Sequence, residues 1–425
     1  MLDIKLIRTE PETVKEGIRR RDMNLDEVID QILAIDTERR GLLSQVEALK
    51  AEQNAASKKI PQLKKEGGDV SALMAEMKTL SAKIKEDDAA VAGLEEKQQE
   101  LLLCLPNLPD SDLLSGGKEN NKPLHYFGEQ PVFDFAAKNH VELCESLGLI
   151  DYERGAKLGG NGAWVYRGMG ARLEWALLNY FISEHIKDGY ELILPPHMLN
   201  YECGYVAGQF PKFGDEVYKI ENPTSADKKF MLPTAETALV NLHRGEILSE
   251  SDLPKKYAAY TPCYRREAGS YRAEERGMIR GHQFNKVEMV QYTTAEGSDA
   301  AFEELVGKAE RLMQGLGLHY RLSKLAAGDC SASMARTYDI EVWIPSMQIY
   351  KEVSSASNAR EYQARRGSIR YRGADGKLAF VHTLNASGLA TSRVFPAIVE
   401  QYQNADGSVT VPEVLRPMVG VDVIR

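Results

Sequence analysis

A charged stretch from Tyr264 to Gln291 carries the residue types that could hold a nucleotide. Its second half alternates in the manner of a strand, and alternation places Phe284, Lys286 and Glu288 on one face. Its first half is expected to place Arg265 and Glu267 on one face for the same reason.

If the two halves pair as a hairpin, one surface combines guanidinium groups, an aromatic ring and carboxylates. Such a surface suits a polyphosphate nucleotide together with a second, amine-bearing substrate. A solvated hairpin with surface salt bridges fits the same pattern, so this stretch does not by itself decide between the two readings.

The composition of the chain narrows the class of protein. A length of 425 residues predicts two or three domains, and 43% hydrophobic with 27% charged residues is typical of a globular protein. The net charge of −9 means that any nucleic-acid contact must come from local basic patches.

Neither a signal peptide nor a membrane-spanning segment is recognisable, so no membrane contact is expected. The five cysteines lack CxxC spacing and no HExxH occurs, which fits a reducing cytoplasm without a zinc site.

Two heptad runs follow a short N-terminal segment and are separated by Gly67 and Gly68. This pattern predicts an antiparallel coiled-coil hairpin of two long helices over about 27–105. Pro61 lies near the expected tip, where a helix can end. The predicted seam positions are Val28, Ile32, Ile35, Arg39, Leu42, Val46, Leu49, Gln53, Ala56, Ile60 and Leu63 in the first run, and Val70, Leu73, Met77, Leu80, Ile84, Asp87, Val91, Leu94, Gln98, Leu101 and Leu105 in the second.

The function of this arm has two interpretations. A generic coiled coil serves as a spacer or an oligomerisation device. Alternatively, lysines such as Lys58, Lys59, Lys64 and Lys65 near the expected tip could contact the phosphates of a large partner. Nearby acidic residues dilute this basic patch.

Residues 106–125 are rich in Pro, Gly, Asn and Asp and are predicted to form a linker. The sequence therefore predicts an N-terminal domain over 1–105 and a large domain over 126–425. In the large domain we expect helices at 172–187 and 297–315, and an antiparallel sheet flanked by helices, an α+β fold. Neither a GxGxxG nor a Walker A loop indicates a standard parallel-sheet nucleotide fold.

Three stretches of the large domain resemble, in the right order, the signature motifs of class II aminoacyl-tRNA synthetases. They are GYELILPPHMLN (189–200), the 264–291 stretch, and SGLATSRVFPAIVEQYQ (387–403). Within that class, three further segments resemble the bacterial-type seryl-tRNA synthetase family: LPTAE (232–236), EVSSASNAREYQARRGSIRYR (352–372) and VPEVLRP (411–417). The helical hairpin resembles the part of that family that holds the long variable arm of its tRNA.

The resemblance implies how ATP is held. Arg265 matches the arginine that binds the α-phosphate and the amino-acid carboxylate, a task that suits a planar guanidinium. Glu267 matches the carboxylate that reads the adenine amino group, and Phe284 matches the ring beneath adenine. Arg280 and Arg393 match arginines on the γ-phosphate and on the opposite side of the base. The full implied ATP set is Arg265, Arg266, Glu267, Arg280, Gly281, Phe284, Glu352, Val353, Ser354, Ser355 and Arg393, in which the role of Gly281 is left open.

The resemblance also implies a serine site and a metal site. Thr234 and Glu236 match residues that bind the serine ammonium, whereas Glu288 and Ser387 match the side-chain pocket. The full implied serine set is Thr234, Ala235, Glu236, Arg265, Glu288, Asn385 and Ser387. Glu352 and Ser355 match contacts of Mg²⁺, which prefers oxygen ligands. The implied catalytic residues are Arg265, Glu352 and Arg393.

The implied activity is serine–tRNA ligation. The carboxylate of L-serine attacks the α-phosphorus of ATP, pyrophosphate leaves, and a 3′-terminal hydroxyl of tRNA(Ser) then attacks the acyl carbon. No catalytic base is needed, because catalysis rests on positioning and charge stabilisation. Motif 1, with Pro196, implies a homodimer. The sequence leaves open whether tRNA(Sec) is served as well.

Two other functions fit parts of the pattern. One is a synthetase-like ligase that loads a small amino acid onto a carrier protein, although such relatives lack the long arm. The other is a non-catalytic paralogue that acts as a scaffold, which we would expect to have lost Arg265, Glu288, Glu352 or Arg393. Ala386 and Ser392 stand at positions where the family frequently has glycine. The sequence does not decide what effect these two departures have.

Overall fold

The computed structural model describes residues 1–221, 228–267 and 277–425. The described chain divides into two compact units. One consists of Leu2–Arg19 and Met23–Pro106, and the other consists of Met1, Arg20–Asp22 and Asn107–Arg425. Within the described residues, no helix is both long enough and apolar enough to cross a bilayer.

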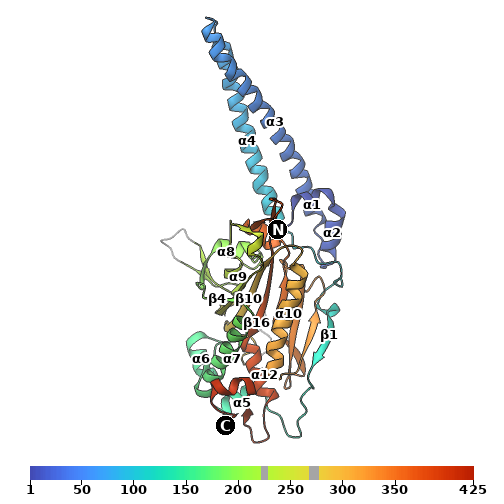
Figure 1. Cartoon of the computed structure of the whole chain (residues 1–425), viewed down its shortest axis with the longest axis vertical. Coiled ribbons are helices and arrows are strands. Elements are labelled where there is room, and N and C mark those ends of the chain that lie inside the picture. Colours follow the sequence, from blue (N-terminus) through green and yellow to red (C-terminus); the bar gives the residue numbers. More distant parts are fainter. Residues whose placement is uncertain (222–227, 268–276) are drawn as a thin grey trace. The chain divides into compact units, whose positions relative to one another are not determined.

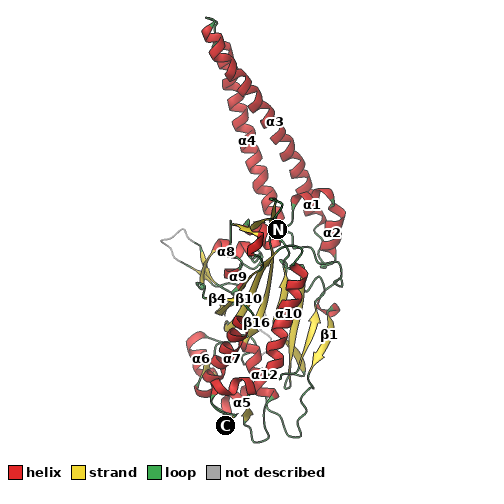
Figure 2. Ribbon diagram, viewed as in Figure 1, coloured by secondary structure: helices red, strands yellow, loops and turns green. Residues whose placement is uncertain are grey.

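The first unit is a helical hairpin with two short helices at its base. These are α1 (Ile4–Thr9) and α2 (Pro11–Arg19), and the long pair is α3 (Asp26–Lys65) and α4 (Ser71–Cys104) (Figures 1 and 2). Every predicted seam position is buried or partly buried, so the heptad prediction is confirmed. Pro61 lies inside α3 near the tip, and the helix ends four residues after it, at Lys65. Gly67, with a φ of 73°, makes the turn that follows.

The second unit is built on an eight-stranded sheet, which confirms the predicted α+β fold. The strand order is β1-β11-β12-β13-β16-β10-β9-β4, and only the β4–β9 pair is parallel. The strands are β1 (Lys122–Phe127), β4 (Glu191–Ile193), β9 (Lys255–Tyr264), β10 (Gln283–Thr293), β11 (Tyr320–Lys324), β12 (Arg336–Ile344), β13 (Ile349–Asn358) and β16 (His382–Ala390).

Three helices cover one face of this sheet: α7 (Gly168–Lys187), α10 (Ser298–Gly315) and α12 (Thr391–Gln401) (Figure 2). The helices expected at 172–187 and 297–315 are confirmed as α7, which begins earlier, at Gly168, and α10. Alternation along the strands sends Ile340 and Val342 of β12 into the core beneath them, and Asp339 and Glu341 to the opposite face. The sheet thus has one apolar face and one polar face, and the polar face is available for chemistry.

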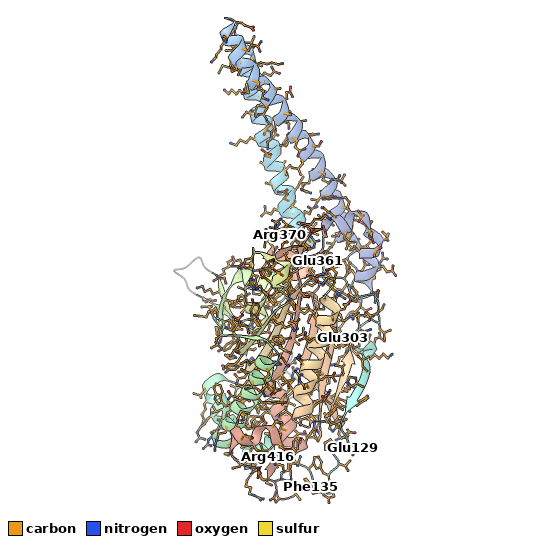
Figure 3. All side chains as sticks on the ribbon, in the orientation of Figure 1. Glu129, Phe135, Glu303, Glu361, Arg370 and Arg416 are labelled. Carbon is orange, nitrogen blue, oxygen red and sulfur yellow. The ribbon has the colours of Figure 1, made fainter. Side chains whose placement is uncertain are left out.

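Shorter elements complete the unit, and side chains crowd the space between helices and sheet (Figure 3). Glu129 and Phe135 mark the loop between β1 and α5 (Figure 3). These shorter elements are α5 (His140–Ser146), β2 (Ile150–Asp151), α6 (Tyr152–Gly159), β3 (Val165–Tyr166), β5 (Met198–Asn200), α8 (Tyr201–Val206), β6 (Lys219–Ile220), β7 (Lys229–Met231), α9 (Glu236–Leu239), β8 (Ile247–Ser249), α11 (Tyr362–Gly367), β14 (Arg370–Arg372), β15 (Leu378–Phe380), β17 (Val409–Thr410), α13 (Arg416–Val419) and β18 (Val423–Ile424).

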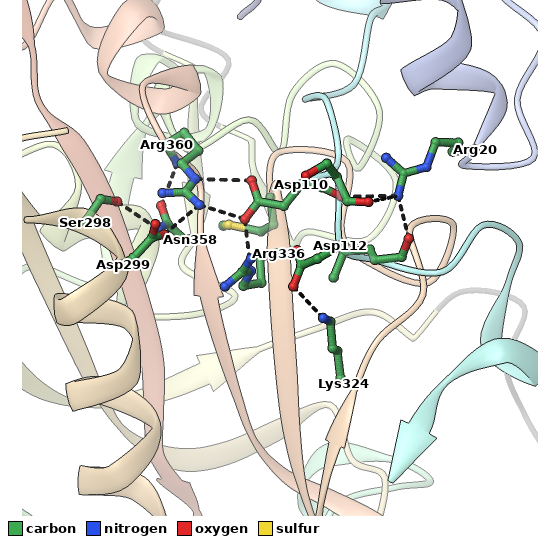
Figure 4. Close-up of polar contacts among 12 residues, drawn as sticks. Arg20, Asp110, Asp112, Ser298, Asp299, Lys324, Arg336, Asn358 and Arg360 are labelled. Carbon is green, nitrogen blue, oxygen red and sulfur yellow. Dashed lines mark hydrogen bonds and ion pairs between the residues drawn. The ribbon is translucent and has the colours of Figure 1, made fainter. Parts of the chain in front are cut away.

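The segment that was expected to be a linker is held firmly against the sheet. Asp110 forms ion pairs with Arg336 at 2.9 Å and Arg360 at 2.7 Å, and Asp112 pairs with Arg336 at 2.7 Å (Figure 4). Further along, β1 lies mostly within the expected linker and pairs with β11 at the edge of the sheet. The Pro- and Gly-rich composition therefore marks an ordered irregular segment here.

Candidate active site

A cavity of about 920 Å³ opens on the polar face of the sheet. Five strands of the sheet, β10, β11, β12, β13 and β16, contribute side chains to it, together with the turn between β7 and α9. The residues that line it include Thr234, Glu236, Arg265, Glu288, Glu352 and Arg393. Positions from the predicted serine, ATP and metal sets therefore share one cavity.

Glu288 of β10 lies at the floor of the cavity and is fully buried. Thr234 donates from Oγ1 to Glu288 Oε2 at 3.1 Å, and Asn385 donates from Nδ2 to Oε1 at 3.3 Å. Lys286, two residues earlier on the same strand face, pairs with Glu288 and also donates to Thr234 Oγ1 at 2.7 Å. A buried carboxylate surrounded by donors can read a hydroxyl group, because its bonding capacity is fixed in place.

Glu236 begins α9 and lines the same part of the cavity. Gln363 of α11 donates to Glu236 Oε1 at 2.8 Å, and Thr383 of β16 donates to Gln363 Oε1 at 2.6 Å. Burial, with a smaller contribution from the nearby charge of Glu288, raises the pKa of Glu236 to about 7 against the opposing hydrogen bond from Gln363. Two carboxylates held close together favour a cationic ligand between them.

A second, smaller cavity adjoins the first and is lined by Phe284, Val353, Arg265, Arg280 and Arg393. The Arg265 guanidinium lies 5.2 Å from the centroid of the Phe284 ring. Arg393 donates from Nη1 to the carbonyl oxygen of Glu352 at 2.7 Å. An aromatic ring and two arginines around one slot provide a flat surface and positive charge, which a purine nucleotide requires.

The expected placement of Arg265 and Glu267 on one strand face is wrong. Strand β9 ends at Tyr264, and Glu267 adopts a φ of 50°, so strand alternation does not extend to these residues. Glu267 still reaches the smaller cavity, where it pairs with Arg280 Nε at 3.1 Å.

Gly281 also lines the smaller cavity, and packing explains why this position is glycine. A β-carbon at Gly281 would lie 2.2 Å from the ring of Trp164. Ala386, one of the two departures from the family pattern, is buried in the core on the far face of the sheet. The extra methyl group of Ala386 therefore points away from the cavity.

Side-chain oxygens that could bind a metal ion lie at the edge of the main cavity near β13. Glu352 and Ser355 line it together with Asp339, which lies directly opposite Ser355 in the β12–β13 pair. Burial raises the pKa of Asp339, and the charge of Glu352 adds to the effect. In the described part of the chain, no three His, Cys, Asp or Glu side chains form a metal cluster. Glu352 and Ser355 nevertheless fit Mg²⁺, which is commonly held by one or two protein oxygens and substrate phosphates.

Three of the expected site residues do not line either cavity. Arg266 donates from Nη1 to the carbonyl of Asp215 at 2.9 Å, and Ser354 donates from Oγ to the carbonyl of Ser387 at 2.6 Å. Ala235 is buried in the smaller core beside β7. The loop tip expected at 270–279 lies outside the described residues apart from its last three positions.

The sequence assigned no role to three residues that the fold brings to the site: Lys286, Asp339 and Gln363. Only Lys286 carried a signal, since it lies between Phe284 and Glu288 on one strand face. Gln363 follows the 352–358 strand by a short turn, and nothing in its surroundings in the sequence marks it as a partner of Glu236.

Comparisons with known proteins agree with this geometry. The family model for the seryl-tRNA synthetase N-terminal domain matches residues 1–109, and the model for the class II core domain (G, H, P, S and T) matches residues 218–402. The serine–tRNA ligase 2 of Clostridium acetobutylicum is 63% identical over 99% of this chain and all of its own length. The serine–tRNA ligase of Fervidobacterium nodosum is 46% identical over all of this chain and 99% of its own.

Solved structures give the same result. The seryl-tRNA synthetase of Pyrococcus horikoshii, complexed with ATP, superposes with a TM-score of 0.94 at 34% identity and covers all of this chain and 99% of its own. The cytoplasmic serine–tRNA ligase of Naegleria fowleri, in complex with AMP, gives a TM-score of 0.88 at 29% identity with the same coverage. With a relative 63% identical over its full length, the chain belongs to the seryl-tRNA synthetase family of class II aminoacyl-tRNA ligases.

Proposed function

We propose that this chain is a serine–tRNA ligase that activates L-serine with ATP and transfers it to tRNA(Ser). The observation that carries the proposal is that two sites adjoin, a buried Glu288 with its donors in the larger cavity and a slot between Phe284 and Arg393 in the smaller one, with Arg265 lining both. The close relatives named as serine–tRNA ligases support it.

In the first step, Arg265 would hold the serine carboxylate beside the α-phosphate and neutralise the charge that develops as pyrophosphate leaves. Its backbone is fixed for this task, because its amide donates to the carbonyl of His282 at 2.9 Å. Arg393 and Phe284 would hold the adenine, while Glu267 reads its amino group and Arg280 takes up the γ-phosphate. Positioning and charge stabilisation supply the catalysis, since a carboxylate is already a nucleophile.

Glu352 and Ser355 would hold Mg²⁺ against the phosphates of ATP. The ion would supply charge neutralisation of the leaving pyrophosphate. Arg393 also restrains Glu352, since Arg393 Nη1 lies 3.5 Å from Glu352 Oε2.

Serine would displace internal contacts in its pocket. Its ammonium group would lie between Thr234 and Glu236, and its hydroxyl would donate to Glu288 beside Ser387 and Asn385. Alanine has no hydroxyl and would leave a buried carboxylate without that donor, which discriminates more strongly than the loss of a methylene.

We also propose that the chain acts as a homodimer. Three large apolar side chains of the motif 1 stretch are exposed, Leu192 on β4, Leu194 just beyond it and Met198 on β5, and Trp175 of α7 is exposed as well. Leu194 is 76% exposed and Met198 is 60% exposed. Apolar side chains clustered in one segment are typical of an interface between subunits.

The hairpin of α3 and α4 would bind the tRNA. Its seam holds the two helices together and leaves the lysines near the turn, among them Lys58, Lys59, Lys64 and Lys65, exposed for phosphate contacts. We propose the cytoplasm as the site of action, and 1–105 and 126–425 as the tRNA-binding and catalytic domains. Charging of tRNA(Sec) is a further proposal that follows from the family alone.

Charging assays with labelled serine test the proposal. Purified protein with ATP and Mg²⁺ should transfer serine to tRNA(Ser) and, in a separate reaction, to tRNA(Sec), but not to an acyl-carrier or peptidyl-carrier protein. Transfer to a carrier protein without transfer to tRNA would refute the proposal and support the synthetase-like ligase instead. Absence of both transfers and of serine activation would support the non-catalytic scaffold.

A further inference from the structure

Glu174 of α7 is a buried carboxylate, 3% exposed, that no step of the proposed reaction uses. It does not line the active-site cavities. Its side chain nevertheless joins two segments that carry adenine-binding residues, one from motif 2 and one from motif 3.

Both joining contacts converge on a single oxygen atom. Asn285 donates from Nδ2 to Glu174 Oε1 at 2.7 Å, and Thr391 donates from Oγ1 to the same atom at 2.6 Å. The same Thr391 Oγ1 lies 3.2 Å from the backbone carbonyl oxygen of Asn285, which is the longer and second acceptor within reach of its single proton. The three residues are therefore in mutual polar contact, and they join α7, β10 and the start of α12.

The two donors are next to the residues that would enclose the adenine. Asn285 directly follows Phe284 on β10, and Thr391 precedes Arg393 by two residues at the first turn of α12. The contact between Asn285 and Thr391 therefore fixes the backbone positions from which the Phe284 ring and the Arg393 guanidinium extend. Asn285 is itself held in orientation, because Tyr260 donates to its Oδ1 at 3.2 Å.

The backbone near Thr391 gives a reason for such a clamp. Leu389, two residues before Thr391, has a φ of 82°, which is unfavourable for a residue with a β-carbon. The turn from β16 into α12 is thus strained, and it needs contacts from neighbouring elements to keep its shape. Glu174 and the core around Leu389 provide those contacts.

We propose that Glu174 is a positioning residue that sets the separation of Phe284 and Arg393 and thereby the affinity of the site for ATP. The inference rests on the proposed function, because it assigns the slot between these two residues to adenine. Serine binding depends on Thr234, Glu236 and Glu288, none of which Glu174 contacts, so the effect should be confined to the nucleotide.

The test is serine-dependent pyrophosphate exchange by the full-length chain, with ATP and serine varied separately. Glu174→Leu keeps the volume and removes the acceptor, and it should raise KM for ATP about tenfold while KM for serine changes by less than about twofold. Glu174→Gln keeps an acceptor oxygen and should restore KM for ATP to within about twofold of the wild type. Equal rises in both KM values, or a failure of Gln to restore KM for ATP, would overturn the proposal.

Thr391→Val offers an isosteric second variant that tests the same clamp if Glu174→Leu does not fold. It should raise KM for ATP about threefold, and adding it to Glu174→Leu should raise KM by clearly less than a further threefold, because the contact of Thr391 with Glu174 is already gone and only its longer contact with the Asn285 carbonyl remains to be lost. Additive effects of the two changes would contradict a shared contact.

Leu177→Ala is the matched control, since Leu177 is fully buried on α7 and its apolar side chain makes no hydrogen bond to Asn285 or Thr391. It should lower the melting temperature and leave KM for ATP unchanged. If it raises KM for ATP as much as Glu174→Leu does, general loosening of α7 explains both and the proposal is wrong. If the wild type itself shows no serine-dependent exchange, the proposed function fails rather than the clamp.

Discussion

The helical hairpin and the sheet-based unit each bury a carboxylate, but they surround it differently. Asp36 of α3 is 1% exposed and accepts from two arginines, Arg8 at 2.7 Å and Arg39 at 3.3 Å. Glu174 of α7 is 3% exposed and accepts from a neutral amide and a neutral hydroxyl, and no ion pair to it is found among the described residues. One carboxylate is compensated by charge, and the other is not.

The pKa values of the two groups differ accordingly. Burial by itself would raise the pKa of Asp36, but the hydrogen bonds from Arg8 and Arg39 outweigh burial and lower it. Burial raises the pKa of Glu174 to about 7, and the hydrogen bonds from Thr391 and Asn285 only moderate the rise. The difference teaches that the acid in the hairpin serves stability, whereas the acid beneath the active site is retained at the expense of stability because it positions other residues.

The largest effect expected in the sheet-based unit is that of Arg265→Ala. It should lower serine-dependent pyrophosphate exchange by about 10³-fold, since it removes the group that would stabilise charge at the α-phosphate. Arg372→Ala is the control, because that guanidinium donates to the carbonyl of Gly376 in an exposed turn. Near-normal exchange by folded Arg265→Ala protein would rule out the role assigned to Arg265.

The largest effect expected in the hairpin concerns tRNA alone. Replacement of residues 30–100 by a short Gly–Ser connection should reduce kcat/KM for tRNA(Ser) by about 10³-fold, because the phosphate contacts are lost. Pyrophosphate exchange should stay within about threefold of the wild type, because no residue of the proposed serine or ATP site lies in 30–100. Full charging by the shortened protein would show that the hairpin does not bind tRNA.

Within the hairpin, Asp36→Ala should lower the free energy of unfolding by about 4 kcal/mol, because it leaves two arginines without their buried partner. Asp88→Ala is the matched control, since Asp88 pairs with Lys50 at 3.0 Å where both side chains are about half exposed. That loss should be about 1 kcal/mol or less. Urea unfolding followed by circular dichroism measures both, and equal losses would contradict the distinction between the two pairs.

The smallest effect is a pH dependence that has opposite sign in the two regions. Because folding raises the pKa of Glu174 from 4.5 to about 7, its folded form binds more protons in that interval, and stability falls as pH rises through it. Relative to the wild type, Glu174→Gln should gain up to about 3 kcal/mol between pH 4.5 and 7. Asp36 has a lowered pKa, so its contribution is present above its unfolded pKa and is lost as pH falls below it.

Denaturation midpoints of the wild type and Glu174→Gln at several pH values measure this difference. Glu153→Gln, at an exposed position of α6, serves as the control and should follow the wild type. A constant difference between Glu174→Gln and the wild type across the interval would mean that Glu174 does not titrate there.

The same contrast explains how much could be predicted from the sequence. The α3–α4 seam follows from local spacing, because each helix buries the residues that recur every three or four positions. The alternation of β10 likewise placed Phe284 and Glu288 on one face. Glu267 was misplaced, because β9 ends at Tyr264 and Glu267, which is not a glycine, itself adopts a positive φ.

Long-range contacts account for what the sequence could not reveal. Glu174 reads as one polar residue in an amphipathic helix, yet its partners Asn285 and Thr391 lie 111 and 217 residues away. From the sequence alone, Asp36 would likewise be assigned to the exposed face of its heptad. Only the fold shows that it pairs with Arg8 of α1. No local pattern encodes such pairs, since only the folded topology brings their elements together.

The central claim is that one cavity activates serine with ATP, and pyrophosphate exchange measured with each of the twenty amino acids tests it most directly. The wild-type protein with ATP and Mg²⁺ should show exchange with serine, and with alanine, threonine and cysteine at least about 10²-fold less. Exchange that favours another amino acid, or no amino-acid-dependent exchange at all, would contradict the claim.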